Sequence, residues 1–474
     1  MLNMRIVAKV GGKSSVKRNS INRSELVNNI PNLVNHVRKR YEKGHELVLV
    51  TSAICDSTNL LEAVYKKKSE NEDCSKEAKS FLDLQYEALR LNNLDTSLII
   101  NEVAEFNKTL CNSYSNKDEL YAAIVSFGEI IGTKIIGSAI QQISKIPVRI
   151  LSSHDIGFKT TGSYRNAQYV EGIEDEVRKN IVIDGKINVV TGWTGKSDDG
   201  KIAVLGRGGS DVTGTYIARI INANRMEFLK DEDLSSTDPK IVPEAKRIDE
   251  VSYLEMEEAA RLGAKVLHPN AVRHLKEKNI EGVFLNVYDN SYKGSRLIRN
   301  ANGKYIVKII TLRENQDIFT VVNEDMSDTP GYLERIALAY AKNGLSIDMI
   351  GSSNISVSCT ANKMDDNKFE QVYRELSGIG YVYPLRGKSL IAAVGEGMKN
   401  KPGTLARLSS ALGDNNIDIE MTSQTPQQIY VGFVVDNDYG KEGLRAIHKE
   451  FFNYRGPVKK AMRHLSEKLR VYSR

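Results

Sequence analysis

Residues 4–15 read MRIVAKVGGKSS, an apolar run that ends in two glycines, a lysine and two serines. The apolar positions within 6–10 are typical of a buried strand, so Gly11 and Gly12 fall at the carboxyl end of that strand. The letters GKS suggest a P-loop, but a P-loop needs a glycine five residues earlier, where this chain has Val7. The stretch therefore predicts a strand and a glycine turn that could hold phosphate by another design.

The order of strand and then helix continues from residue 1 to about residue 300. Strand-like runs cover 4–10, 45–54, 146–151, 187–193, 202–209 and 281–287. Helix-like stretches cover 25–43, 77–92, 128–143, 211–222 and 253–262. This alternation favours a mostly parallel sheet covered by helices, in which ligands collect at the carboxyl ends of the strands.

Length and composition are those of an ordinary globular protein with roughly two to four domains. The chain has 474 residues, and its net charge of +6 is too small to indicate nucleic acid as a partner. Its four cysteines form no Cys-x-x-Cys pair, which argues against a zinc site or a disulfide framework. No apolar stretch approaches the roughly 20 residues that cross a bilayer, and the N-terminus has no signal pattern. We therefore expect a cytoplasmic protein that binds no membrane.

The last third of the chain contains an internal repeat. The stretch 328–358 begins DTPGYLERIALAYAKNGLSIDMI, and a similar stretch, NKPGTLARLSSALGDNNIDIEMT, begins 72 residues later at 400. Each copy predicts a strand, a Pro-Gly turn, a helix and then paired strands, and the polar tract 299–305 predicts the linker before them. Two copies are too few for a solenoid, so we expect a packed pair of small sandwiches whose edge strands pair with another chain.

Three glycine clusters, at 11–12, 192–195 and 206–209, follow predicted strands. Glycines let backbone N–H groups approach phosphate oxygens, and the third cluster also precedes a helix, whose N-terminus favours anions. Lys9 lies in the buried strand before the first cluster, where lysine is normally avoided. It is either a fixed cation aimed at a transferring phosphoryl group or a lysine that reaches solvent at a strand edge.

Two polar stretches accompany these clusters. Ser126–Glu129 leads into the apolar helix 130–140, which is equally typical of an ordinary helix start. The loop 160–165 ends in Arg165, whose guanidinium either clamps a carboxylate or is merely solvated.

Taken together, these motifs resemble those of the aspartate kinases of the amino acid kinase superfamily. The matching stretches are Lys9–Ser14, Ser52–Ile54, Thr58–Asn59, Ser126–Glu129, Arg165, Leu205–Asp211, Ser236–Lys240 and Gly263–Pro269. The C-terminal repeat resembles the two regulatory ACT domains of the same enzymes. The resemblance covers nearly the whole chain, and the order of the motifs is preserved.

The resemblance implies an α/β fold. We expect an amino acid kinase three-layer sandwich with a mostly parallel central sheet over residues 1–303. Two ferredoxin-like βαββαβ ACT domains would follow, over 304–387 and 388–474. It also implies a monofunctional enzyme that forms a homodimer or higher homo-oligomer through its ACT domains.

The implied reaction transfers the γ-phosphoryl group of ATP to the β-carboxylate of L-aspartate and gives 4-phospho-L-aspartate. This is the first step toward lysine, threonine and methionine. A carboxylate with a pKa near 3.9 is already ionised at neutral pH, so the enzyme needs no general base. Catalysis is then mainly positioning and charge neutralisation, and Mg²⁺ arrives bound to ATP because the sequence offers no multi-carboxylate cage.

The resemblance also assigns residues to roles. The catalytic residues are Lys9 and Asp211, and the substrate-binding residues are Ser52, Thr58, Glu129 for the ammonium and Arg165 for one carboxylate. The nucleotide-binding residues are Lys9, Gly11, Gly12, Gly208, Gly209, Ser210, Lys230, Asp231, Lys240 and Lys265. A lysine or threonine effector would meet Met326, Gly331, Ile347, Ser352, Ser353 and Asn354. His268, before a proline at a helix start, is expected to be structural.

Several positions depart from the family pattern. Lys13 replaces a threonine, Lys240 replaces an arginine, and 352–354 lacks the usual glutamate. Because lysine cannot make the planar two-point contact of arginine, nucleotide affinity could differ. Two alternatives remain: another kinase of the superfamily, or an amino-acid-sensing paralogue with a weakened kinase half.

Overall fold

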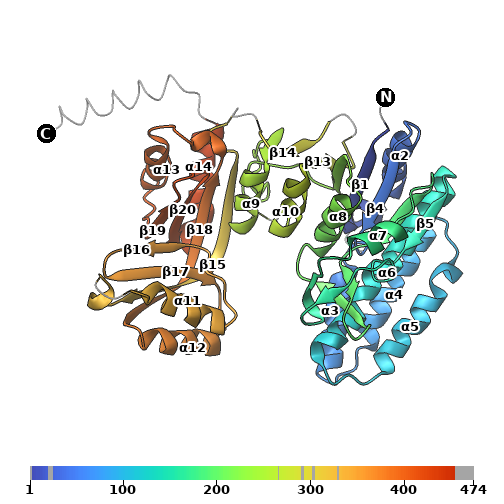
Figure 1. Ribbon diagram of the computed structural model, residues 1–474, viewed down its shortest axis with the longest axis horizontal. Helices are drawn as coiled ribbons and strands as arrows, with labels where there is room; N and C mark the ends of the chain where they lie inside the picture. Colours follow the sequence, from blue (N-terminus) through green and yellow to red (C-terminus); the bar gives the residue numbers. More distant parts are fainter. Residues whose placement is uncertain are drawn as a thin grey trace. The chain divides into compact units, whose positions relative to one another are not determined.

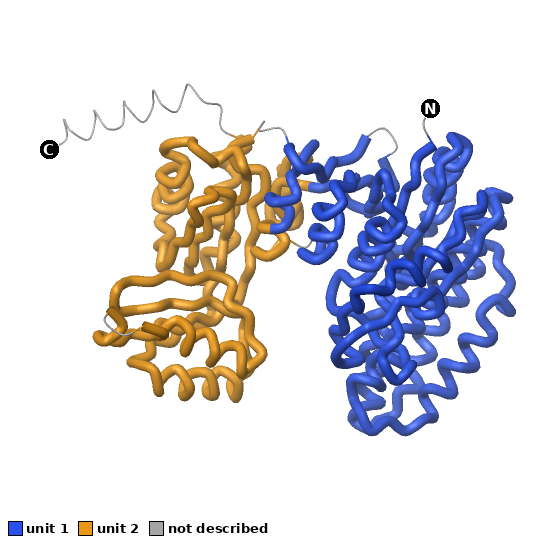
Figure 2. Tube along the Cα trace, in the orientation of Figure 1, with its two compact units in different colours: residues 1–234, 249–257, 266–301 blue, residues 235–248, 258–265, 302–474 orange. Residues whose placement is uncertain are grey.

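The computed structural model describes residues 3–19, 25–264, 266–289, 293–301, 305–327 and 330–453. The chain divides into two compact units (Figure 2). The first comprises 1–234, 249–257 and 266–301, and the second comprises 235–248, 258–265 and 302–474. The predicted boundary at 303/304 lies outside the described residues, and so does the basic C-terminal segment after 453.

The first unit is built on an eight-stranded sheet. Its strand order is β12 (Glu250–Ser252), β14 (Ser295–Ile298), β13 (Glu281–Asn286), β11 (Arg225–Lys230), β1 (Arg5–Val10), β4 (Glu46–Thr51), β8 (Ile187–Thr191) and β5 (Val148–Leu151). Neighbouring strands are parallel except for β13 and β14. The predicted mostly parallel sheet is therefore confirmed.

Helices lie on both faces of this sheet, with α2 (Ile30–Tyr41) and α6 (Lys117–Ser144) on one face and α8 (Gly209–Ile220) on the other (Figure 1). Other helices up to residue 278 are α1 (Gly12–Ser15), α3 (Ser57–Ser69), α4 (Ser75–Leu91), α5 (Ile100–Cys111), α7 (Glu174–Asn180), α9 (Tyr253–Arg261) and α10 (Pro269–Lys278). Side chains alternate along β1: Ile6, Ala8 and Val10 lie in the core that α2 and α6 share, whereas Lys9 lies on the face where Gly214 of α8 approaches it.

Some element boundaries differ from the predictions. The N-terminal part of the predicted helix 25–43 is strand β3 (Leu26–Asn28), which pairs with β2 (Val16–Arg18). The predicted strand 202–209 contains β10 (Ile202–Leu205), but β10 lies outside the main sheet. It belongs to a four-stranded sheet with the order β6 (Thr160–Thr161), β7 (Arg165–Tyr169), β10 and β9 (Thr194–Lys196).

Two predictions that concern helix α6 are wrong. Its N-cap Asn116 accepts from the N–H groups of Asp118 and Glu119, so the helix begins far before 128 and Ser126–Glu129 lies in its interior. The helix is also long and apolar enough to cross a membrane by length and composition, contrary to the prediction that no stretch is. However, 78% of its apolar window is buried within the protein, as expected of a core helix.

The second unit carries the repeat as one antiparallel sheet. Its elements in chain order are β15 (Ile309–Val322), α11 (Tyr332–Lys342), β16 (Ile350–Ser352), β17 (Ser356–Asn362), α12 (Asp366–Ser377), β18 (Tyr381–Val394), α13 (Thr404–Gly413), β19 (Met421–Gln424), β20 (Tyr430–Asp436) and α14 (Gly440–Phe452). The strand order is β16-β17-β15-β18-β20-β19. Each copy thus has the predicted order of strand, turn, helix and paired strands.

The two copies are not separate sandwiches, because β15 and β18 run through both. Residues 309–313 pair with 390–394 beside β20, whereas 318–322 pair with 381–385 beside β17. The register shifts between these stretches, so each long strand contributes one half to each copy. The second copy therefore takes a strand from the beginning of the unit.

Candidate active site

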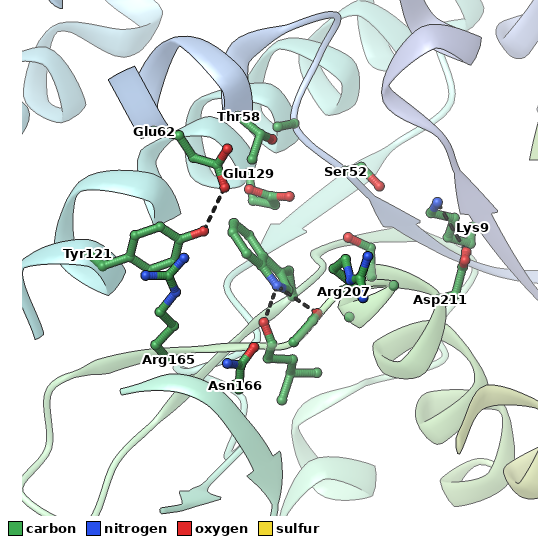
Figure 3. A pocket seen from close by; sticks show the side chains of 17 residues that line it. Lys9, Ser52, Thr58, Glu62, Tyr121, Glu129, Arg165, Asn166, Arg207 and Asp211 are labelled. Carbon is green, nitrogen blue, oxygen red and sulfur yellow. Dashed lines mark hydrogen bonds and ion pairs between the residues drawn. The ribbon is translucent and has the colours of Figure 1, made fainter. Parts of the chain in front are cut away.

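A cavity of about 600 Å³ lies in the first unit (Figure 3). It is lined by Lys9, Ser52, Ala53, Thr58, Glu62, Tyr121, Glu129, Arg165, Asn166, Trp193, Leu205, Gly206, Arg207, Gly208, Gly209, Ser210 and Asp211. Strands β1, β4 and β8 end beside it, and helix α8 begins there, as expected of ligand sites in parallel sheets. The fold thus brings together the predicted catalytic and substrate-binding residues.

Lys9 and Asp211 form an ion pair at one end of the cavity. Lys9 Nζ lies 3.1 Å from Asp211 Oδ1, and the two side chains are only 13% and 9% exposed. Asp211 is in the first turn of α8, where backbone N–H groups without intrahelical acceptors favour anions. This end of the cavity therefore combines a buried ammonium with a helix N-terminus.

Two of the predicted phosphate-binding glycines are required by the fold, Gly12 because another segment passes close to it and Gly208 because of its positive φ. A Cβ at residue 12 would lie 2.1 Å from Ala53 O, so only glycine fits between β1 and the segment after β4. Gly208 caps α8 with φ +74°. The N–H groups of Gly11 and Gly209 donate to Leu229 O and Gly206 O, so they are already engaged and the predicted phosphate contact would have to displace these bonds.

The other predicted nucleotide residues lie in different places. Lys230, at the end of β11, donates to Val266 O, and burial lowers its pKa below that of a solvated lysine. Asp231 follows directly, and neither residue lines the cavity. Lys265 lies outside the described residues. The segment with Lys240 belongs to the second unit, where Ile310 N donates to Ser236 O.

Glu129 lies in the interior of α6, with its carboxylate facing the cavity (Figure 3). The side chain is buried, and Oε2 has no hydrogen-bond partner among the described residues. Burial raises the pKa of Glu129 to about 8, because the charged form is deprived of water. A cationic group entering the cavity would supply the missing partner.

Arg165 is the first residue of β7 and lies across the cavity from this carboxylate. Within the described part of the chain its guanidinium makes no ion pair or side-chain hydrogen bond, and its Cζ lies 4.0 Å from the centroid of the Tyr121 ring. Ser52, after β4, and Thr58, in the first turn of α3, add hydroxyl groups to the cavity wall. A free cation and a free carboxyl group thus face one cavity.

The sequence prediction missed Glu62, Tyr121, Asn166, Trp193 and Arg207 among the lining residues. Tyr121 precedes Glu129 by eight residues, about two helical turns, and Glu62 follows Thr58 by four. Helical spacing from the predicted residues was therefore an available signal for both. Trp193 lies within the glycine cluster 192–195 that the sequence analysis singled out, but its contact across the loop, in which Nε1 donates to Gly206 O at 3.1 Å, could not be read from the sequence.

The predicted effector residues lie in the second unit, and none of them lines the cavity described there. Met326 and Ile347 pack against the core of the first copy, and Gly331 caps α11 with φ +97°. Ser353 N donates to Ser356 O in the turn after β16, and this turn is exposed. The cavity described in this unit is elsewhere, at about 260 Å³, lined by Asn315, Asp317, Lys363, Asp366, Arg386 and Gly387.

Comparisons with known proteins agree with the fold. The model of the amino acid kinase family matches residues 4–286, and an ACT domain model matches 391–451. Aspartokinase 1, chloroplastic, of Arabidopsis thaliana is 28% identical over 429 residues, which cover 85% of this chain and 74% of that protein. The aspartokinase of Thermus thermophilus is 29% identical over 319 residues, which cover 65% of this chain and 77% of that protein.

A solved structure shows the same fold over most of the chain. The structure of E. coli aspartokinase III in complex with aspartate and ADP has a TM-score of 0.78 at 22% identity and covers 94% of this chain and 99% of that one. The predicted fold class and the resemblance to aspartokinases with C-terminal ACT domains are thereby confirmed. The chain belongs to the amino acid kinase family.

Proposed function

We propose that this protein transfers the γ-phosphoryl group of ATP to the β-carboxylate of L-aspartate, giving 4-phospho-L-aspartate as the first step of the aspartate-derived amino acid pathway. The observation that carries the proposal is that three groups line one cavity: the guanidinium of Arg165, the buried carboxyl group of Glu129 and the ammonium of Lys9 beside the N-terminus of α8. The predicted class of enzyme, an aspartokinase, is confirmed by the relatives.

The charges of the cavity complement those of an acidic amino acid. Glu129 binds the ammonium group, Arg165 binds one carboxylate through paired N–H groups, and the hydroxyls of Ser52 and Thr58 complete the site. Among the described residues no side chain forms an ion pair with the Glu129 carboxyl group, and Lys9, one of the cations of the cavity wall, already pairs with Asp211. A ligand with one ammonium group and one carboxylate satisfies both groups, and the second carboxylate of L-aspartate then remains to accept the phosphoryl group.

Lys9 provides the charge neutralisation that the phosphoryl transfer requires. An anionic nucleophile approaches an anionic triphosphate, and a buried ammonium beside a helix N-terminus lowers the cost of that approach. Asp211 holds Lys9 Nζ in place.

We propose that Mg²⁺ enters with ATP as part of the substrate. Among the described residues no group of three or more His, Cys, Asp and Glu side chains could hold a metal ion. The ion would therefore rely mainly on phosphate oxygens and water, and would supply further positive charge there.

We also propose that the second unit binds lysine or threonine as an effector, that it mediates homodimer formation, and that the protein is cytoplasmic. The predicted effector residues cluster in the first copy of the repeat, and β16 and β19 are the two end strands of the antiparallel sheet. The structure of E. coli aspartokinase III in complex with lysine and aspartate has the same fold, with a TM-score of 0.69 at 22% identity. Activity and oligomeric state measured with and without each amino acid test the effector and homodimer proposals.

The function is tested by ADP release with a panel of acceptors: L-aspartate, L-glutamate, N-acetyl-L-glutamate and UMP. We expect turnover with L-aspartate, and trapping of the acyl phosphate by hydroxylamine as a hydroxamate. Turnover with another acceptor alone would indicate a different kinase of the family. No turnover with any acceptor would contradict the kinase function and favour a sensing role.

A further inference from the structure

Arg165 has one described neighbour that fixes its guanidinium, and that neighbour is an aromatic ring. The side chain is half-buried at the start of β7, and among the described residues no carboxylate or carbonyl group holds it. Arginine side chains are long and lose much rotamer freedom when they are fixed. An arginine that must meet a carboxylate in one orientation therefore needs a support.

Tyr121 supplies that support. Its ring lies 4.0 Å from Arg165 Cζ, well within the range of a cation–π contact (Figure 3). A guanidinium that rests on a ring keeps its N–H groups in its own plane, where they remain available for a two-point contact with a carboxylate. The tyrosine thus holds the cation without using its donors.

The ring is itself held on two further sides. Its hydroxyl group donates to Glu62 Oε1 at 2.9 Å, and Tyr65 of α3 contacts it edge-on at 5.1 Å between centroids. The ring is only 5% exposed.

We propose that Tyr121 is a positioning residue that presents Arg165 to the substrate carboxylate, and that Glu62 holds Tyr121 in place. Helix α6 then serves both ends of the amino acid: Glu129 directly, and Arg165 through Tyr121, two turns earlier. This inference rests on the proposed function, because it assumes that Arg165 meets a carboxylate of L-aspartate.

The test is steady-state kinetics of Tyr121→Leu and Tyr121→Phe in the full-length protein, with L-aspartate and ATP varied separately. We expect Tyr121→Leu to raise KM for L-aspartate about 5- to 20-fold, the range of a partly buried cation–π contact. KM for ATP should remain within about 2-fold of wild type. Tyr121→Phe retains the ring and loses only the Glu62 bond, so it should raise KM for L-aspartate no more than about 3-fold.

A double-mutant cycle separates positioning from a merely structural role. In an Arg165→Ala background there is no cation left for the ring to position, so Tyr121→Leu should add less than about 2-fold to KM for L-aspartate. If the two substitutions raise KM for L-aspartate independently, so that their fold-changes multiply in the double mutant, the proposal is overturned. Equal rises in KM for L-aspartate and KM for ATP would overturn it as well. A wild-type protein without activity on L-aspartate would refute the proposed function itself, which the wild-type assay decides before any variant is compared.

Discussion

The two cavities described above differ in how an arginine at the wall of each is partnered. In the larger one, Arg165 and Glu129 lack charged partners among the described residues. In the smaller one, Arg386 Nη1 donates to Asp366 Oδ1 at 2.7 Å, and its Nη2 donates to Met364 O. Charged groups whose partners come from the protein stabilise the fold, whereas groups left free at a cavity wall await a ligand. The comparison therefore favours the first unit, where an arginine without a charged partner and a buried, unpaired carboxyl group face the same cavity, as the place where a charged ligand binds.

The largest effect on activity is expected at the ion pair between Lys9 and Asp211 in the larger cavity. Lys9→Ala removes the ammonium beside the transferring group and should lower kcat by roughly 10²- to 10³-fold, as for other lost donors to a transition state. Turnover with saturating L-aspartate and ATP measures the loss. Near-normal turnover would remove Lys9 from the mechanism and leave the glycine loops as the only phosphate contacts.

Substitution of the free guanidinium should mainly weaken binding of the amino acid. Arg165→Ala should raise KM for L-aspartate roughly 10- to 100-fold, because it removes charge-assisted hydrogen bonds. The matched control is Arg386→Ala in the smaller cavity, which should leave this KM within about 2-fold. Equal effects of the two variants would show that free and satisfied arginines do not differ in function.

The free carboxyl group should make stability depend on pH. The pKa of Glu129 is about 8 in the folded protein and near 4.5 for an unburied carboxyl group, so folding favours its protonated form. The contribution of Glu129 to the unfolding free energy is fully present below pH 4.5 and is lost as the pH rises through 8. We therefore expect the unfolding free energy of the ligand-free protein to fall over this range by more in wild type than in Glu129→Gln, as measured by urea denaturation. Identical pH slopes would contradict the buried, unpaired state.

The smallest effect is expected at Lys13, which created the resemblance to a P-loop. Its side chain is exposed in α1 and does not line the cavity. Lys13→Thr should therefore change KM for ATP by less than about 3-fold, in contrast to Lys9→Ala four residues away. A larger change would extend the nucleotide site beyond the described cavity.

The sequence pattern predicted those parts of the fold that neighbouring residues determine. The strand predicted at 4–10 and the position of the glycines at its end are confirmed, and so is the order of elements in each repeat. The motifs of the resemblance also led to Lys9, Glu129 and Arg165, which the fold brings into one cavity.

Pairings between distant residues could not be predicted in this way. The N–H group of Gly11 bonds to Leu229 O across a strand pair that only the folded sheet creates. The extent of α6 was missed because its apolar character continues on all sides of a buried helix, where no periodic pattern marks a face. The sharing of β15 and β18 between the two copies likewise depends on register, which a repeat in the sequence does not reveal.

The most direct test of the central claim is calorimetric titration of L-aspartate into the protein at pH 7, in buffers with different ionisation enthalpies. If the ammonium of L-aspartate pairs with Glu129, binding must ionise a carboxyl group whose pKa is about 8. The account predicts release of about one proton per L-aspartate bound at pH 7, and loss of that release in Glu129→Gln. Binding of L-aspartate without proton release would contradict it.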